Sequence, residues 1–429
     1  MIGNGYQNIF RIPELKRRII YSLLLLAVYR VGVHVPTPGI DAVALEKVFE
    51  AYKHGILAIF NMFSGGALER LSVFALGIMP YISASIIIQL LTVVIPALER
   101  LSKEGEQGRK KITQYTRYGT IGLSVIQGFG ISVGLESMGT VITPGIGFKI
   151  MTVLTLTAGT SFIMWLGEQI TEKGIGNGIS LIIFAGIIAR LPNAMGNTLQ
   201  QLSLGEIKIF TVLVLVVFML AVVGFIIFVE QGQRRIPVHY AKRIVGRKIF
   251  GGQNTHLPLK INTSGVIPPI FASSIIMFPA TLASFIPFMK GIEEFLRPGS
   301  FIYELVFVVF IFFFCYFYTA VTFNPSDVAE NMKKNGGYIP GIRPGKSTAD
   351  YIDKVLTRIT LGGACYVSLI CVLPSVLISK FNVPFYFGGT ALLIVVGVAI
   401  DTIAQIESHV LTRHYEGFLK KGGFRSRGR

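Results

Sequence analysis

Charged side chains are scarce in this sequence. Asp, Glu, Lys and Arg make up only 15% of its 429 residues, whereas hydrophobic residues make up 52%. A soluble protein of this length needs far more charge to cover its surface, so this composition excludes an ordinary soluble domain. The mean hydropathy of +0.61 agrees. We therefore predict an integral membrane protein.

Cysteine is also nearly absent. The three thiols, Cys315, Cys365 and Cys371, lie inside apolar runs. Cys365 and Cys371 are six residues apart, which places them on different faces of one helix. We expect buried, reduced thiols with neither a disulfide nor a metal role.

Motifs for catalysis and for nucleotide or metal binding are missing. There is no His-Glu-x-x-His and no Cys-x-x-Cys, and the six histidines are scattered. Residues 341–347 resemble a phosphate-binding loop, but Pro340 occupies the place of its first glycine. The glycine-rich stretch 174–178 precedes a membrane helix, so we interpret it as a flexible turn. We expect no enzyme activity, cofactor or metal, and any driving energy must come from a partner.

What the sequence does contain is a series of apolar runs of about 20 residues, the length that crosses a hydrocarbon core about 30 Å thick. Helices are the only plausible form, because lipid offers no hydrogen bonds to the backbone. The first run follows Lys16-Arg17-Arg18, but no small-residue cleavage site follows it, so we interpret it as a retained span rather than a signal peptide. We predict ten spans, at 19–35, 74–95, 118–138, 150–166, 179–194, 209–229, 265–285, 301–323, 359–378 and 387–406.

Basic residues give these spans an orientation. They gather near the N-terminus, at 100–117, at 234–248, at 333–346 and in the tail after 412. With ten spans all five clusters fall on one side, and the positive-inside tendency makes that side cytoplasmic, with both termini on it. The formal charge of +17 is then concentrated on one face.

Two of the basic loops, 230–260 and 324–358, are longer than a connection between spans requires. Basic loops can simply set topology and contact anionic headgroups. Long basic loops also suit an acidic partner such as ribosomal RNA or a docking protein. We favour docking for these two loops and keep the topological role for the short N-terminal cluster.

The ten spans divide into two equal halves. We predict an N-terminal half at 1–206, a C-terminal half at 207–406 and a cytoplasmic tail at 407–429. Pro80 in the second span has its counterpart in three prolines of the seventh, and the short fifth span corresponds to a tenth that Asp401 interrupts. Paired broken spans indicate an inverted repeat, so the second, fifth, seventh and tenth spans should line the functional path.

A secondary transporter with inverted repeats is the alternative class. Ion-coupled transporters usually carry an ionisable residue near mid-span. Here Arg30, Arg190 and Asp401 lie towards span ends, and mid-span positions are mostly Ile, Leu, Val, Ser and Gln. A hydrophobic constriction fits this pattern better than a solute site.

Four stretches resemble the SecY family of protein-conducting channels. They are 74–85 (FALGIMPYISAS), 165–178 (WLGEQITEKGIGNG), 255–260 (THLPLK) and 340–345 (PGIRPG). The resemblance implies an all-α membrane protein with ten transmembrane helices in two inverted five-helix halves around an hourglass pore. It implies a channel in the bacterial inner membrane that translocates unfolded polypeptides and inserts membrane proteins laterally.

The resemblance also implies a ring of aliphatic side chains that closes the pore. Ile78 and Ile82 are four residues apart and share one helix face. The other members lie on the paired irregular spans. Any one of these isoleucines alone would be read as core or lipid-facing, so the interpretation depends on the whole set. The ring consists of Ile78, Ile82, Ile183, Ile270 and Ile394.

Ahead of the second span, glycines and charges break the stretch 56–72 too often for it to cross a membrane. The resemblance places a plug helix here, on the external side of the ring. An ordinary external loop is the other interpretation, but the apolar run at 56–60 would then face water. The implied plug residues are Phe63, Ser64, Gly65, Gly66, Leu68, Glu69 and Arg70.

The seam between the second and seventh spans is implied as a lateral gate, through which apolar segments leave for lipid. Ser85, Gln89, Ser274 and Phe278 would line it. Gln89 also fits plain interhelical packing.

The resemblance implies docking residues and partners as well. The partners are SecE-like and SecG-like subunits, the SecA motor ATPase, the ribosome, polypeptides that bear signal sequences, and the lipid bilayer. The docking residues for the motor or ribosome lie in the two long basic loops and are Arg243, Arg247, Lys248, Arg343 and Gly345.

Overall fold

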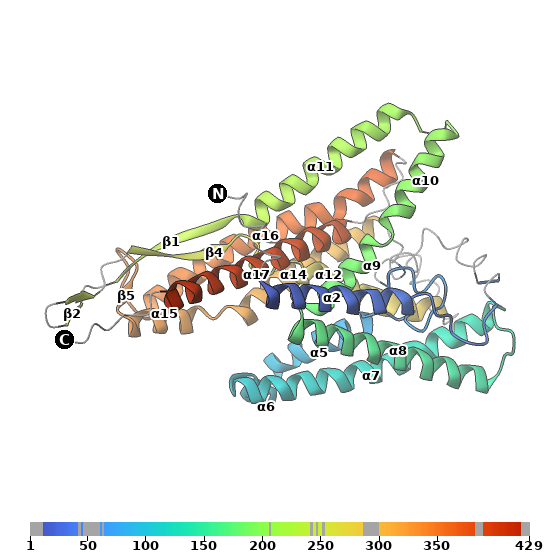
Figure 1. The fold of residues 1–429 in the computed structure, drawn as a ribbon, viewed down its shortest axis with the longest axis horizontal. Helices are drawn as coiled ribbons and strands as arrows, with labels where there is room; N and C mark the ends of the chain where they lie inside the picture. The colour runs from blue at the N-terminus through green and yellow to red at the C-terminus, as the bar shows by residue number, and fades with distance from the viewer. Residues whose placement is uncertain are drawn as a thin grey trace. The chain divides into compact units, whose positions relative to one another are not determined.

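The computed structural model is mainly helical, and each of the ten predicted spans contains a helix (Figure 1). By length and composition, seven helices among the described residues are able to cross a membrane, or eight if one bent pair counts as a single span. The structure describes residues 12–41, 44–45, 61, 64–205, 207–240, 243–245, 248–250, 254–285, 300–381 and 389–421.

The chain divides into two compact units. The first comprises Met1–Asn197, Ala280–Gly291 and Ile394–Arg429, and the second comprises Thr198–Pro279 and Ile292–Leu393. The main division therefore lies near residue 197, whereas the sequence placed it at 206, and the two-half organisation stays a prediction.

Eight helices lie wholly or mainly in the first unit. They are α2 (Pro13–Gly32), α5 (Met79–Val94), α6 (Pro96–Lys103), α7 (Glu106–Ser137), α8 (Ile146–Lys173), α9 (Gly178–Ile188), α10 (Leu191–Ser203) and α17 (Gly389–Lys421). α7 and α8 run side by side over most of their length (Figure 1).

The second unit combines helices with a three-stranded sheet and a two-stranded hairpin. Its helices are α11 (Ile209–Gln231), α12 (Ile267–Phe285), α14 (Phe301–Thr322), α15 (Pro325–Lys334) and α16 (Lys346–Phe381). Its strands are β1 (Gln233–Tyr240), β2 (Arg243–Val245), β3 (Lys248–Phe250), β4 (Asn254–Lys260) and β5 (Gly337–Tyr338). The sheet has the order β4-β1-β5, and β2 and β3 form the hairpin.

Prolines decide where the second span begins and ends. The sequence predicts a helix from residue 74, but the helix starts at Met79. Gly77 has a φ of 57°, which is not a helical value, and Pro80 stands in the first helical turn, where proline is favoured. At its other end Ile95 is extended, as a residue before proline prefers. α6 then leaves at 101° to α5.

Two expectations about single residues are wrong. Asp401 does not interrupt the tenth span, because α17 continues through it and its carboxylate is exposed, so no charge is buried. Cys365 is exposed on α16 rather than buried, while Cys315 and Cys371 are buried. On a helix apolar enough to span a membrane, a small apolar thiol costs little at an exposed position, so an apolar run does not by itself predict burial.

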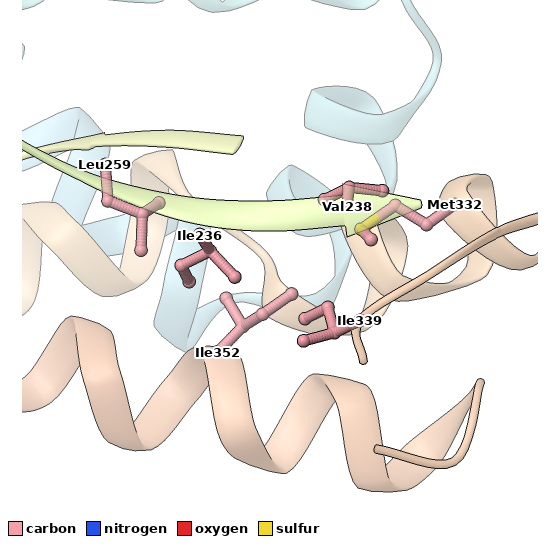
Figure 2. Packing of buried hydrophobic residues seen from close by; sticks show 6 residues of the cluster. All are labelled: Ile236, Val238, Leu259, Met332, Ile339 and Ile352. Carbon is pink, nitrogen blue, oxygen red and sulfur yellow. The ribbon is translucent and has the colours of Figure 1, made fainter. Parts of the chain in front are cut away.

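The described parts of the two long basic loops pack together. β1 and β4 pair antiparallel from Gln233↔Lys260 to His239↔Asn254, and β5 joins the other edge of β1. Side chains alternate along β1, with Ile236 and Val238 buried and Arg235 exposed. The two buried side chains of β1 pack against side chains of β4, α15 and α16 and against the residue that follows β5. The cluster consists of Ile236, Val238, Leu259, Met332, Ile339 and Ile352 (Figure 2).

This cluster gives a test of the joint packing. Ile352 lies on α16 under the sheet and is fully buried. Ile352→Ala should destabilise the packing by about 2–5 kcal/mol, because it leaves a cavity. We expect trypsin to cleave after Arg234 and Arg235, on the β1 strand that packs on this cluster, at least about tenfold faster in detergent-solubilised protein, because cleavage follows the population of the open form.

The matched controls are Ile352→Val, which removes one methylene, and Lys354→Ala, on the exposed face of the same helix. Both should be cleaved at nearly the parental rate. A parental rate for Ile352→Ala would show that the two loops are not held together by this cluster.

Candidate functional site

The five isoleucines of the predicted ring are all buried. Ile394 is 0% exposed and Ile270, the most exposed, is 8% exposed. Ile78 is the N-cap residue of α5, and the backbone N–H of Ile82 donates to the carbonyl of Ile78 at 3.1 Å, which places the two side chains on one face. Ile183 lies on α9, Ile270 on α12 and Ile394 on α17.

An aromatic stack anchors the turn that precedes Ile78. The ring of Phe74 stacks on Tyr29 of α2 and on Phe162 of α8, with centroids 6.0 Å apart in both pairs, and Phe162 contacts Trp165. Gly32 faces the same ring so closely that a Cβ there would lie 2.0 Å from Phe74. The signature stretch 74–85 is thus positioned by residues far away in the sequence.

The described part of the predicted plug is a series of turns. The expectation of a helix is wrong for residues 64–72, because Gly65, Gly66 and Leu71 have φ values of 68°, 88° and 37°. Leu71 is the only non-glycine residue with a positive φ among those described. Ser64 and Leu68 are buried, whereas Glu69 and Arg70 are exposed; Phe63 lies outside the described residues.

Hydrogen bonds tie this segment to the chain that follows α2. The N–H of Thr37 donates to the carbonyl of Leu71 at 2.9 Å, and the N–H of Val73 donates to the carbonyl of Val35 at 2.9 Å. Pro36 and Ser72 form an isolated antiparallel bridge between these two bonds. The non-helical backbone therefore has partners, as buried backbone requires.

The loop 174–178 before α9 is held in the same way by distant side chains. The Ser22 hydroxyl of α2 accepts from the N–H of Ile175 at 3.0 Å, and Gln405 of α17 accepts from the N–H of Gly176 at 3.0 Å. Asn177 caps α9 by accepting from the N–H of Ile179 at 3.1 Å. The sequence identified this stretch but neither Ser22 nor Gln405, because no local pattern marks a partner 153 or 229 residues away.

The predicted gate residues lie on α5 and α12. Ser85 and Gln89 are half-buried on α5. Ser274 is 3% exposed on α12, and its hydroxyl donates to the carbonyl of Ile270 one turn earlier at 2.8 Å. The side chain of Phe278 lies outside the described residues, so the lining of a gate stays a prediction.

The predicted docking residues lie around the sheet. Arg343 is exposed, and its carbonyl accepts from the hydroxyl of Thr348 at 2.9 Å. Gly341 and Gly345 flank it with φ values of 81° and 104°, which shape a tight turn that favours glycine.

The other predicted docking residues lie in or beside the β2–β3 hairpin. Arg243 pairs through its backbone with Phe250 in this hairpin. Lys248 lies on β3, and Arg247 is outside the described residues.

Nearby α15 adds a basic end to this surface. Asn324 caps its start by accepting from the N–H of Ser326 at 3.1 Å, and Lys333 and Lys334 stand in its last turn, where the helix dipole favours cations. A hydrogen bond from Lys334 lowers the pKa of Glu330. Among the described residues no group of three or more His, Cys, Asp or Glu side chains could hold a metal ion.

Comparisons with known proteins agree on one family. The family model described as SecY matches residues 72–403. The chain is 54% identical over 426 residues to the protein translocase subunit SecY of Escherichia coli strain K12, which covers 97% of this chain and 96% of that protein.

Solved structures share the fold at low identity. One is described as showing that the plug domain of SecY stabilises the closed state of the translocation channel, with a TM-score of 0.68, 17% identity and 92% of both chains covered. Another is Sec61 in the canine ribosome–channel complex, with a TM-score of 0.63, 17% identity and 92% of both chains covered. With its family model matched over most of its length and a relative that shares more than half of its residues, this chain belongs to the SecY family.

Proposed function

We propose that this chain is the channel subunit of a protein translocase, through which unfolded polypeptides cross a membrane and apolar segments enter it. Its near-full-length identity of 54% to a translocase subunit carries the proposal. The chain is a channel rather than an enzyme, so the energy for transport comes from its partners.

The five buried isoleucines act as the seal of this channel. A pore that passes any polypeptide cannot bind one sequence, so its constriction must be apolar and free of fixed hydrogen-bonding groups. Aliphatic side chains meet this requirement because a narrow apolar passage excludes water and ions by dewetting. The burial of all five side chains and their positions on α5, α9, α12 and α17 support this role.

Residues 64–72 act as a plug against this seal, and α5 and α12 form the lateral gate. The plug role is supported by the buried side chains of Ser64 and Leu68, which fold the segment back into the first unit. The gate role is supported by the polar Ser85 and Gln89 on α5 and Ser274 on α12.

The sheet and the turn around Arg343 form the docking surface for the ribosome and the SecA motor. An exposed arginine between two glycines, in a turn that follows the sheet's last strand, suits contacts with RNA phosphates or acidic side chains. SecE-like and SecG-like subunits complete the complex. The membrane is the bacterial inner membrane, with both termini on its cytoplasmic side.

The seal is tested with polar substitutions in the ring. Ile82→Asn combined with Ile270→Asn should raise the resting ion conductance of reconstituted channels about tenfold and relax the need for a good signal sequence. The amide holds water in the constriction, and a closed state favoured by only a few kcal/mol shifts visibly under such a change.

Two controls match this experiment. Ile82→Val keeps the ring apolar, and Ile87→Asn places the same amide on the exposed face of α5, where Ile87 is 46% exposed. Both should remain ion-tight. A double Asn variant as tight and as signal-selective as the parent would contradict the seal.

The docking surface is tested by reversing one charge. Arg343→Glu should weaken binding to ribosomes and to SecA, and for ribosomes should reduce the slope of log affinity against log salt by about one, as for one lost phosphate contact. Lys103→Glu, an exposed change in another basic loop, should have a smaller effect. Equal binding by the Arg343→Glu variant and the parent would leave the loop with a topological role only.

Orientation is tested by labelling single cysteines in a cysteine-free background with a membrane-impermeant maleimide. Cysteines at Lys103 and Arg343 should react only from the cytoplasmic side. A cysteine at the exposed Ile142, in the turn between α7 and α8, should react only from outside. Labelling of position 103 or 343 in intact cells would overturn the proposed topology.

A further inference from the structure

Two neighbouring side chains of α2 hold the start of the 64–72 segment. The hydroxyl of Tyr29 donates to the carbonyl of Ser64 at 3.2 Å, and Nη1 of Arg30 donates to the carbonyl of Gly65 at 3.1 Å. Tyr29 is only 1% exposed. Two successive carbonyls outside any helix or strand are thus bound by donors from a spanning helix, and that of Ser64 also accepts from the N–H of Ala67 at 3.3 Å.

A second set of contacts fixes the segment at Glu69. Asn61 and Glu69 bond reciprocally: the amide of Asn61 donates to the Glu69 carboxylate at 3.0 Å, and the N–H of Glu69 donates to the Asn61 side chain at 3.1 Å. Arg190, in the bend between α9 and α10, reaches the same carboxylate oxygen, with Nη2 3.9 Å away. The segment is therefore tied back to Asn61 and also held by the bend that follows α9.

Between these two sets of contacts, the backbone of the segment lies directly against α9. A Cβ on Gly65 would stand 2.9 Å from the Cα of Gly186, and Gly65 has a φ of 68°, so both geometry and space favour glycine there. Gly186 follows Ile183 by three residues, so the two lie on the same face of α9. The face that receives the segment is the face that carries a proposed ring residue.

We propose that Tyr29, Arg30 and Arg190 form a latch that sets how readily the 64–72 segment leaves its closed position. The proposal rests on the proposed function, because it assigns to that segment the role of a plug. These contacts can break and form again as the segment leaves and returns. Arg190 and Glu69 are 39% and 48% exposed, so water can replace their interaction, and the bonds to the two carbonyls do not require a particular side chain on the segment.

Arg30 and Arg190 thereby acquire a common role that their positions in the sequence did not suggest. Each stands near the end of a spanning helix and reaches a different part of one segment. A polypeptide entering the channel has to break these contacts and expose the buried Ala67 and Leu68 to displace the segment, while the hydrogen bonds at Leu71 and Val73 keep its far end attached.

The latch is tested with substitutions that remove the hydrogen-bond donors of Tyr29 and Arg30 but keep side chains of similar size. Tyr29→Phe deletes one hydroxyl and keeps the stack on Phe74, and Arg30→Met keeps a long side chain without its donors. In a cysteine-free background with a single cysteine at Leu68, which is 3% exposed, the double variant should react with a soluble maleimide about tenfold faster. Its resting ion conductance should rise as well.

A charge swap tests Arg190 without relying on a loss of function. Arg190→Glu should raise both the labelling and the conductance, and adding Glu69→Arg should return both towards parental values. Lys149→Met is the matched control, because it breaks a 2.7 Å ion pair with Glu136 at the ends of α7 and α8, away from the segment. It should leave labelling and conductance unchanged.

Parental labelling in the Tyr29→Phe, Arg30→Met variant, or a swap no better than Arg190→Glu alone, would overturn the latch. A deletion of 64–70 separates this failure from failure of the proposed function. If that deletion opens the channel to ions while the latch variants stay closed, the latch is wrong and the plug stands. If the latch variants label faster while neither they nor the deletion conduct, the latch holds and the plug role is wrong.

Discussion

The need to satisfy backbone hydrogen bonds without water governs this structure. A spanning helix meets that need within its own segment, and this is why each apolar run became a helix. Where the backbone is not helical, other residues must supply the partners. Residues 64–78 and 174–178 are two such stretches, and side chains of α2, α8 and α17 bond to their backbone. In these non-helical stretches the backbone is therefore bonded to residues that are distant in the sequence.

Those two stretches adjoin proposed ring residues. The turns at 64–78 lead into Ile78 and Ile82, and the loop at 174–178 leads into Ile183. A few polar contacts therefore position apolar side chains whose own interactions have no direction. This arrangement suits the gate proposed above, in which the seal would stay dry while hydrogen bonds that water can replace would set the free energy of opening.

The second unit follows a different rule. The strand β1 and the turn around Arg343 carry exposed charge, yet both also pack on one apolar cluster beneath the sheet. Burial there is of the kind found in soluble domains, with alternating side chains on β1 facing α15 and α16. A rigid base of this kind holds charged side chains at fixed positions, which a disordered basic loop could not do.

The sequence by itself determined the membrane class, the ten helices and the family resemblance, because hydropathy and spacing are local properties that each segment expresses independently. It misjudged the start of α5 and the effect of Asp401, and it expected a helix where the described residues 64–72 form turns. Those outcomes depend on φ values at Gly65, Gly66, Leu71 and Gly77 and on burial, none of which hydropathy reports. Only the tertiary structure decided that Tyr29, Arg30 and Arg190 converge on one segment, because they lie 35 residues before it or more than 100 after it.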